Sequence, residues 1–257
     1  MKRRAMMANE KLKTYKYGKD VLKNKTIFIT GATDGIGRVL AIQSAKLGAK
    51  VVIHGRNKKK LEVVYDEIIV DPKCRKPVIA MLDYETATSE TYSSLSESIM
   101  NDFKCIDGLI HCAGILGDRS SIEQYDPGLW QKVIHVNLTA PFVLTQALMP
   151  SLKLSKHPSI IFTSSGVGQI GKAFWGAYCV SKFGTEALSQ ILAQELTHTS
   201  FRVNCINPGA VKTKMRLAAY PAENRDKLKS PEEILSPYIF LMDDESLGIT
   251  NKCYDAQ

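Results

Sequence analysis

The feature that most constrains the fold is a regular alternation between short apolar runs and longer amphipathic segments. Six runs have the length and composition of strands: Thr26–Thr30, Lys50–His54, Pro77–Leu82, Ile106–His111, Ser159–Thr163 and Arg202–Ile206. The segments between them carry apolar residues at helical spacing: Ile36–Leu47, Lys58–Ile69, Ser89–Phe103, Leu129–Leu154 and Tyr178–Leu196. Strands that alternate with helices form parallel sheets, so we expect an α/β fold, a doubly wound parallel sheet with helices on both faces.

The length of 257 residues and the hydrophobic content of 44% suit one large core. We therefore expect a single domain over residues 21–257, after a flexible basic extension over residues 1–20. The start, Met1 to Arg4, is basic but lacks the apolar region of a signal peptide, and Met6 or Met7 is an alternative start. No uninterrupted apolar run of about 18 residues is present, so we expect a cytoplasmic protein without a membrane span.

The net charge is +8, yet Lys and Arg are spread along the chain instead of forming one stripe. A solvated basic surface is therefore favoured over nucleic-acid binding, which would appear as salt-sensitive retention on DNA or RNA. The six cysteines form no CxxC pair and no Cys/His cluster, so reduced thiols and no metal site are predicted.

A glycine-rich turn, Thr30 to Gly37, joins the first strand to the first helix. Its glycines let the backbone approach a ligand closely, and the N–H groups at the helix start favour a pyrophosphate. The alternative is that Gly31 and Gly35 serve only the packing of strand and helix. The position of the turn favours a Rossmann-like dinucleotide site, whose expected contacts are Gly31, Thr33, Asp34, Gly35, Ile36 and Gly37.

The residues after the second strand bear on the choice of cofactor. NAD-binding folds place an acid there for the ribose 2′-hydroxyl, whereas this chain has Arg56 near that position. Arg56 can pair with a 2′-phosphate, so NADP(H) is predicted over NAD(H), the alternative being an exposed surface arginine. Asp34 counts against this assignment, because its charge lies near the expected phosphate. Asp83, after the third strand, is a candidate partner for the adenine amino group or else an exposed loop acid.

The residues that suit acid–base chemistry follow the fifth strand. That strand delivers Ser164 and Ser165 to the edge of the sheet where ligands bind in such folds. Tyr178 and Lys182 lie one helical turn apart on the same face. Because the pKa of a free tyrosine is about 10, a positive charge from Lys182 is expected to lower it. We predict that Tyr178 is the acid in carbonyl reduction and the base in alcohol oxidation, and that Ser165 stabilises the substrate oxygen.

These motifs resemble the short-chain dehydrogenase/reductase family, and the resemblance runs from Lys25 to the last residue. The TGxxxGxG motif of that family stands at Thr30 to Gly37, its YxxxK motif at Tyr178 to Lys182, and its serine at Ser165. The resemblance implies that Asn137 holds a water that connects the lysine to a proton relay. The alternative for Asn137 is a packing role at a helix bend.

Two further stretches carry the resemblance, one with a departure. The Pro208-Gly209 motif and Thr213 are implied to contact the nicotinamide end of the cofactor, although a plain turn is the alternative. Ala113 and Gly114 allow close approach of the cofactor, but Cys112 stands where the family usually has an asparagine. The asparagine ties neighbouring strands together, so we expect its loss to affect stability rather than catalysis.

Within the family the chain is most similar to the bacterial YciK-type oxidoreductases, through Trp175 to Tyr178 and through Tyr254 to Gln257, where the family usually has Asp-Gly-Gly. This resemblance implies NADP(H) and a bacterial cytosolic enzyme, without a particular substrate. It also implies a homodimer or homotetramer formed through the helices Leu129–Leu154 and Tyr178–Leu196.

The candidate substrate pocket is apolar and comprises Leu116, Trp175 and Met215, unless these are simply core residues. The stretch between Thr213 and Ser230, where the family builds its substrate lid, is short and favours a compact carbonyl or alcohol compound. The sequence therefore predicts an NADP(H)-dependent oxidoreductase. The alternative is a non-catalytic NADP(H)-binding sensor or scaffold, which the intact Ser165, Tyr178 and Lys182 set disfavours.

Overall fold

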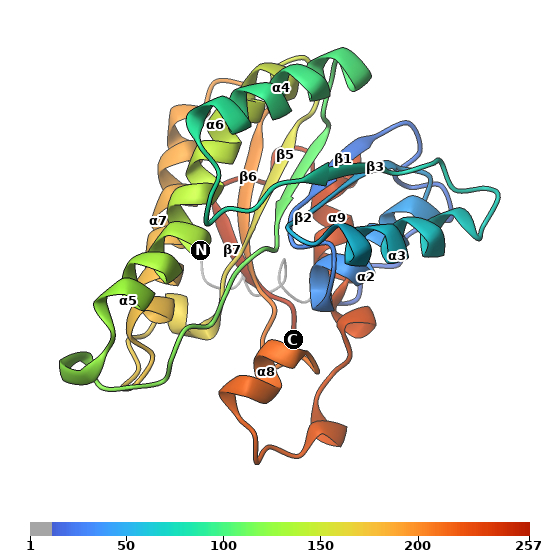
Figure 1. Cartoon of the computed structure of the whole chain (residues 1–257). Coiled ribbons are helices and arrows are strands. Elements are labelled where there is room, and N and C mark those ends of the chain that lie inside the picture. Colours follow the sequence, from blue (N-terminus) through green and yellow to red (C-terminus); the bar gives the residue numbers. More distant parts are fainter. Residues whose placement is uncertain (1–11) are drawn as a thin grey trace.

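Seven parallel strands form the centre of the computed structural model, which describes residues 12–257 (Figure 1). Their order across the sheet is β3-β2-β1-β4-β5-β6-β7. The strands are β1 (Thr26–Ile29), β2 (Lys50–Gly55), β3 (Val78–Met81), β4 (Gly108–His111), β5 (Ser159–Thr163), β6 (Arg202–Asn207) and β7 (Lys252–Asp255). The strand order reverses between β1 and β4, and such a switch point opens a crevice at the carboxyl ends of the strands.

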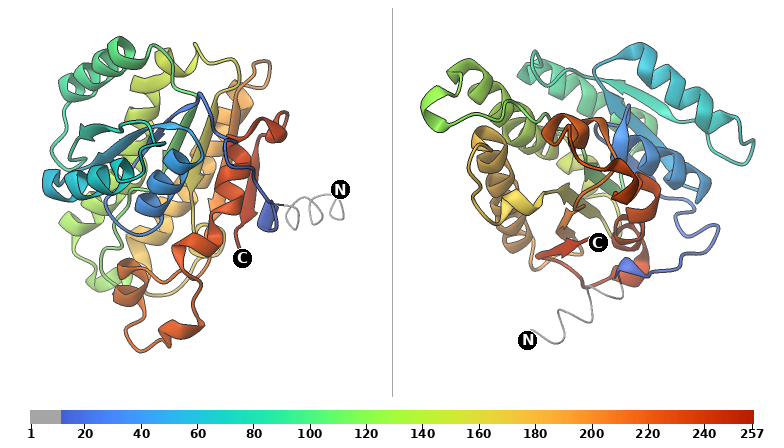
Figure 2. Two further views of the ribbon diagram at one scale, coloured as in Figure 1. Left: turned by 90° about the vertical axis from the view of Figure 1, so that its right-hand side faces the viewer. Right: turned by 90° about the horizontal axis from the view of Figure 1, so that it is seen from below.

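Helices cover both faces of the sheet (Figure 2). The α-helices are α2 (Gly35–Lys46), α3 (Lys58–Ile69), α4 (Ser89–Phe103), α5 (Pro127–Ile134), α6 (Ala140–Leu152), α7 (Gly176–Glu195), α8 (Lys214–Ala219) and α9 (Ser236–Met242). The 3-10 turns are η1 (Ile122–Gln124), η3 (Gly166–Gly168), η4 (Arg225–Lys227), η5 (Pro231–Ile234) and η6 (Asp244–Ser246), and η2 (His135–Thr139) is a π-helical turn between α5 and α6.

The two faces of the sheet bury separate apolar clusters. Ile27 and Ile29 of β1 pack with α2, α3 and α9, whereas Phe28 between them packs with α4, α6 and α7. Successive side chains of a strand point to opposite faces, so a strand covered on both sides is apolar throughout. This explains why the central strands appear in the sequence as unbroken apolar runs.

The predicted fold class is confirmed, and the six predicted strands and five predicted helical segments are present with small shifts at their ends. Leu129–Leu154 corresponds to α5, η2 and α6 in succession. The sequence missed α8, α9 and β7. Three of the four residues of β7 are exposed, so it lacks the apolar pattern of a strand.

The first described residues pack against the domain. Leu12 is 1% exposed, and Tyr15 stacks edge-on against Phe240 with ring centroids 5.0 Å apart and donates a hydrogen bond to Asp243. Leu12 and Tyr15 are therefore packed against the core near α9, whereas the predicted division into an extension over residues 1–20 and a domain over residues 21–257 stays a prediction. The rest of that extension, and the choice among the starting methionines, lies outside the described residues.

The run Pro127–Leu152 is long and apolar enough to cross a membrane, with a mean hydropathy of 1.2. The sequence predicted no such segment. Its residues Leu144, Leu148 and Leu152 are fully buried in the core beside β4 and β5. Packing against the sheet therefore accounts for the apolar character of this helix.

Candidate active site

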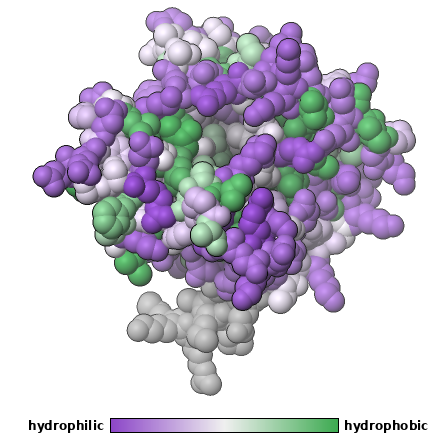
Figure 3. Space-filling model, turned by 60° about the horizontal axis from the view of Figure 1, so that its bottom comes forward, coloured by the Kyte–Doolittle hydropathy of each residue, from purple (hydrophilic) through white to green (hydrophobic). Residues whose placement is uncertain are grey.

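A cavity of about 400 Å³ lies at the carboxyl edge of the sheet. Figure 3, which brings the lower side of Figure 1 forward, shows hydrophobic side chains among hydrophilic ones on this side of the molecule. The cavity brings together nineteen predicted residues: Gly31, Thr33, Asp34, Gly35, Ile36, Gly37, Arg56, Asp83, Ala113, Gly114, Leu116, Ser165, Trp175, Tyr178, Lys182, Pro208, Gly209, Thr213 and Met215. Of the predicted site residues, Asn137 alone is absent from its lining.

The glycine loop packs tightly against the end of β4. Gly31 has a φ of +66°, and a Cβ there would lie 2.8 Å from the Cα of Ala113. The hydroxyl of Thr30 accepts hydrogen bonds from the backbone N–H groups of Cys112 and Ala113, both at 3.0 Å. The loop is thus fixed from behind while Thr33 to Gly37 line the cavity at the start of α2. A fixed glycine turn that leads into a twelve-residue helix fits a pyrophosphate.

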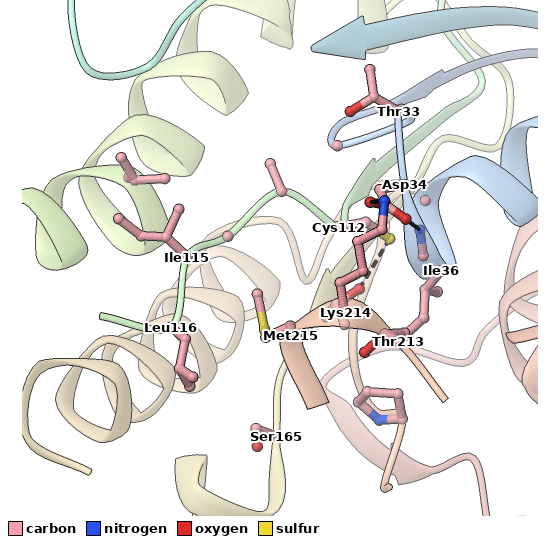
Figure 4. A pocket seen from close by; sticks show the side chains of 18 of the residues that line it. Thr33, Asp34, Ile36, Cys112, Ile115, Leu116, Ser165, Thr213, Lys214 and Met215 are labelled. Carbon is pink, nitrogen blue, oxygen red and sulfur yellow. Dashed lines mark hydrogen bonds and ion pairs between the residues drawn. The ribbon is translucent and has the colours of Figure 1, made fainter. Parts of the chain in front are cut away.

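Asp34 caps α2 and also reaches across the mouth of the cavity. Its carboxylate accepts from the N–H of Gly35 at 2.8 Å and forms an ion pair with the Nζ of Lys214 on α8, also at 2.8 Å (Figure 4). The Lys214 ammonium holds the pKa of Asp34 below its usual value. This pairing neutralises the charge that counted against a phosphate near the glycine loop.

Arg56 lies at the end of β2 and is 57% exposed at its side chain. It forms an ion pair with Glu85, whose other carboxylate oxygen lies 2.7 Å from the Nζ of Lys132. Lys132, and to a smaller extent Arg56, keep the pKa of Glu85 below its usual value. Asp83 lines the cavity beside them and accepts from the N–H of Glu85 at 3.1 Å. Glu85 is thus shared between two cations at this corner of the cavity.

Tyr178 and Lys182 occupy the buried face of α7. Tyr178 is 8% exposed and Lys182 is 6% exposed. The Nζ of Lys182 lies 5.6 Å from the centre of the Tyr178 ring and donates to the backbone carbonyl of Thr163 at 2.7 Å. Ser165 follows β5 and lines the same cavity. The structure therefore brings the three predicted residues together from two separate elements.

Burial is the largest cause of the pKa shifts of Tyr178 and Lys182. It raises the pKa of Tyr178 to about 12, against the opposing effect of the Ser165 hydroxyl, and lowers the pKa of Lys182 to about 8. The sequence predicted that the charge of Lys182 lowers the pKa of Tyr178, whereas the net shift in the structure is upward. The loss of water around the phenol outweighs a lysine that points to Thr163. Tyr178 is accordingly protonated at neutral pH.

Asn137 lies behind the cavity in the π-helical turn. Its side-chain oxygen accepts from the N–H of Ile115 at 2.8 Å, and its Nδ2 donates to the Ile115 carbonyl at 2.9 Å and to the Ser181 hydroxyl at 3.1 Å. These bonds tie the helix bend to the loop after β4 and to α7. The geometry gives Asn137 the packing role, and its part in a proton relay stays a prediction.

Cys112 replaces the usual asparagine without separating the strands. Its thiol lies 3.3 Å from the Thr163 hydroxyl, which in turn lies 3.2 Å from the Tyr238 hydroxyl. Burial raises the pKa of the Cys112 thiol to about 11, so the group is neutral. The ends of β4 and β5 are therefore connected by a thiol and a hydroxyl in place of an amide.

The turn after β6 brings Pro208 and Gly209 to the cavity that Tyr178 and Lys182 also line. Thr213 caps α8 by accepting from the N–H of Arg216 at 3.1 Å. Gln257 supports this turn by donating to the carbonyls of Pro208 and Ala210. The sequence singled out Gln257 only as part of a resemblance and gave it no role.

The substrate side of the cavity is apolar and is closed by α8. Leu116 and Met215 face it (Figure 4), and Trp175 is buried with its ring centre 5.8 Å from that of Tyr178. Arg119 stacks at 4.9 Å on both Trp175 and Tyr220 and donates to the Ala219 carbonyl. These contacts hold α8 over the pocket.

Sequence reasoning missed Glu85 in the cavity lining and did not foresee the stacking of Arg119 on Trp175 or the pairing of Lys214. Each acts through a partner far away in the chain, and single-sequence patterns carry no signal for such pairs. Glu85 alone gave a weak indication, because it follows the third strand at the edge where ligands bind.

Comparisons with known proteins identify the family of this chain. A model of the short chain dehydrogenase family matches residues 25–224. The chain is 44% identical to the uncharacterized oxidoreductase YciK of Escherichia coli (strain K12) over 243 residues, which cover 95% of this chain and 96% of that protein.

Two solved structures of short chain dehydrogenases are similar over nearly the whole chain. One, from Shigella flexneri 2a str. 301 and complexed with NADP, is 44% identical with a TM-score of 0.90 and covers 93% of this chain and 100% of its own. The other, from Escherichia coli CFT073 and complexed with NADPH, is 45% identical with a TM-score of 0.91 and covers 94% and 100%. The resemblance to YciK-type proteins that the motifs predicted is confirmed.

Proposed function

The chain belongs to the short-chain dehydrogenase family of oxidoreductases, and we propose that it uses NADP(H) to interconvert a compact carbonyl compound and its alcohol. One observation carries the proposal. Tyr178, Lys182 and Ser165 converge on the same cavity as the glycine loop, so acid–base groups and a dinucleotide site share one space.

The residues along the edge of the sheet fit NADP(H) in an extended pose. The start of α2 suits the pyrophosphate, and Arg56, which follows β2, suits a 2′-phosphate. The last residues of β2 include no Asp or Glu that would repel this phosphate. Asp83 lies where it can accept from the adenine amino group. Two similar short chain dehydrogenases were crystallised with NADP and NADPH, which supports the same choice here. When bound, NADPH supplies the hydride for the carbonyl carbon.

The protein residues supply the proton and hold the substrate oxygen. A carbonyl oxygen that receives a hydride at its carbon develops negative charge, which hydroxyl donors stabilise. Tyr178 gives its proton to that oxygen, and the Ser165 hydroxyl orients it by a hydrogen bond. Lys182 places a positive charge behind the resulting tyrosinate. The raised pKa of Tyr178 favours the protonated form at neutral pH, which is the form that reduction requires.

Substitution of Tyr178 by Phe tests the proposal, because it removes the proton and keeps the ring. NADPH consumption is measured with a panel of small ketones and aldehydes. We expect the variant to bind NADPH as the wild type does and to lose turnover by roughly 10²- to 10⁴-fold. Turnover that persists in the variant, or NADPH binding without any turnover in the wild type, would contradict the proposed function. The second result would favour the sensor or scaffold.

We also propose that the chain forms a homodimer or homotetramer through α6 and α7. Phe142 on α6 and Val180, Phe183 and Ile191 on α7 are 43% to 55% exposed, although they are large and apolar. Exposed large apolar residues on long helices are typical of a subunit interface. A cytoplasmic location, inferred from the similarity to bacterial YciK-type proteins, belongs to the same proposal.

A further inference from the structure

The turn that follows β6 lies at the opposite end of the cavity from Arg56. In the sheet order, β1, β4 and β5 separate β2 from β6. Pro208 and Gly209 line the cavity at the β6 end, which is also the end of Tyr178 and Lys182. A dinucleotide that binds its adenosine phosphate at Arg56 therefore brings its reactive ring to this turn. Gly209 has a φ of +72°, so the turn holds a conformation that most residues avoid.

The segment after β7 fixes this turn through several hydrogen bonds. The Nε2 of Gln257 donates to the carbonyl of Pro208 at 2.7 Å and to that of Ala210 at 3.0 Å. The N–H of Ala256 donates to the carbonyl of Asn207 at 2.9 Å. Gln257 thus binds the carbonyls of Pro208 and Ala210 on either side of Gly209, and Ala256 binds the carbonyl of Asn207 before the turn.

The packing of Gln257 is as specific as its hydrogen bonds. A Cβ at Gly209 would lie 2.7 Å from the Nε2 of Gln257, so the amide fills the space beneath the glycine. The backbone carbonyl of Gln257 in turn accepts from the Nζ of Lys13. The two hydrogens on Nε2 allow this one nitrogen to bond both carbonyls. Gln257 does not line the cavity and therefore acts through the turn.

We propose that Gln257 is a positioning residue that holds the Pro208-Gly209 turn in the shape that binds the nicotinamide half of the cofactor. This inference rests on the proposed function. Gln257 sets the affinity for the reactive half of NADP(H), whereas Arg56 sets the affinity for the half that carries the 2′-phosphate. The two halves are accordingly controlled by separate residues at opposite ends of the sheet edge.

Binding of NADPH and of 2′,5′-ADP, which lacks the nicotinamide, separates these roles without any substrate. Dissociation constants are measured by calorimetry for the wild type and for Gln257→Ala and Gln257→Glu. The Glu variant keeps the volume and the length of the side chain but has no hydrogens for the two carbonyls. We expect both variants to bind NADPH about tenfold more weakly and to bind 2′,5′-ADP with unchanged affinity.

A matched control is Gln169→Ala. Gln169 also donates its Nε2 to this part of the chain, to the Cys253 thiol at 3.3 Å, but contacts neither the turn nor the cavity. The Gln169→Ala variant should bind NADPH and 2′,5′-ADP as the wild type does. Equal losses of NADPH and 2′,5′-ADP in the Gln257 variants, or unchanged NADPH binding in Gln257→Glu, would overturn the proposal. A wild type that binds neither ligand would overturn the proposed function itself.

Discussion

The two ends of the cavity hold their functional residues in opposite ways. At the β2 end, Arg56, Glu85 and Lys132 are partly exposed and joined by ion pairs alone. At the β5 and β6 end, Lys182 is buried and donates to a backbone carbonyl, and the turn beside it is fixed by Gln257. Exposed ion pairs contribute little to stability and rearrange easily, whereas buried polar groups keep their geometry because an unpaired one is costly. The first end is suited to recognition of a charged group, and the second to chemistry at a fixed place.

The largest effect is expected from Lys182→Met, which removes the buried charge at the β5 and β6 end. Turnover should fall roughly 10²- to 10⁴-fold, because Tyr178 then loses the cation that stabilises its ionised form. Initial rates of NADPH oxidation measure this. A loss below about tenfold would mean that the lysine only fills space.

The same variant has a pH signature in stability. Burial lowers the pKa of Lys182 to about 8 from an ordinary value of 10.5, so between these values the unfolded chain binds more protons than the folded one. The free energy of unfolding of the wild type, relative to that of Lys182→Met, should therefore rise as pH increases from about 8 to 10.5. Below pH 8 the difference between the two proteins should stay constant. Urea unfolding at several pH values checks this, and parallel curves for the two proteins would contradict it.

A smaller effect is expected at the exposed end. Arg56→Ala should weaken NADPH binding by roughly 10- to 100-fold and leave NADH binding nearly unchanged, because only the former carries the proposed phosphate partner. Arg38→Ala is the matched control, since Arg38 also pairs with a glutamate but does so between α2 and α3, outside the cavity lining. Equal losses for both cofactors would break the assignment.

The smallest effect is expected from Glu85→Gln. Glu85 competes with a phosphate for Arg56, so its neutralisation should strengthen NADPH binding by about two- to fivefold, more at low salt than at high salt. Titration of NADPH fluorescence at two ionic strengths measures this change. Weaker binding in the variant would show that Glu85 instead holds Arg56 in its binding position.

Local patterns were enough for the framework. The β1 strand, the glycine turn and the α2 helix are contiguous in the sequence, so their residue pattern predicts this local structure directly. The spacing of Tyr178 and Lys182 fixed their common helix face in the same way. The β7 strand was missed because its stability comes from pairing with β6, and its exposed residues lack the alternation that marks a strand. The burial of Leu12 and Tyr15 was missed because their neighbours in the sequence are polar and basic, so the local pattern does not indicate packing against α9.

The sequence by itself determined the α/β order and the glycine turn, and it singled out the candidate acid–base residues, since each depends on neighbours within one strand, turn or helix. Tertiary structure decided the electrostatic state of those residues. The pKa of Tyr178 rises because distant elements exclude water from it, although a lysine lies one turn away. It also decided the pairings of Asp34 with Lys214, Arg56 with Glu85 and Gln257 with the Pro208 turn, because folding alone brings such distant residues together.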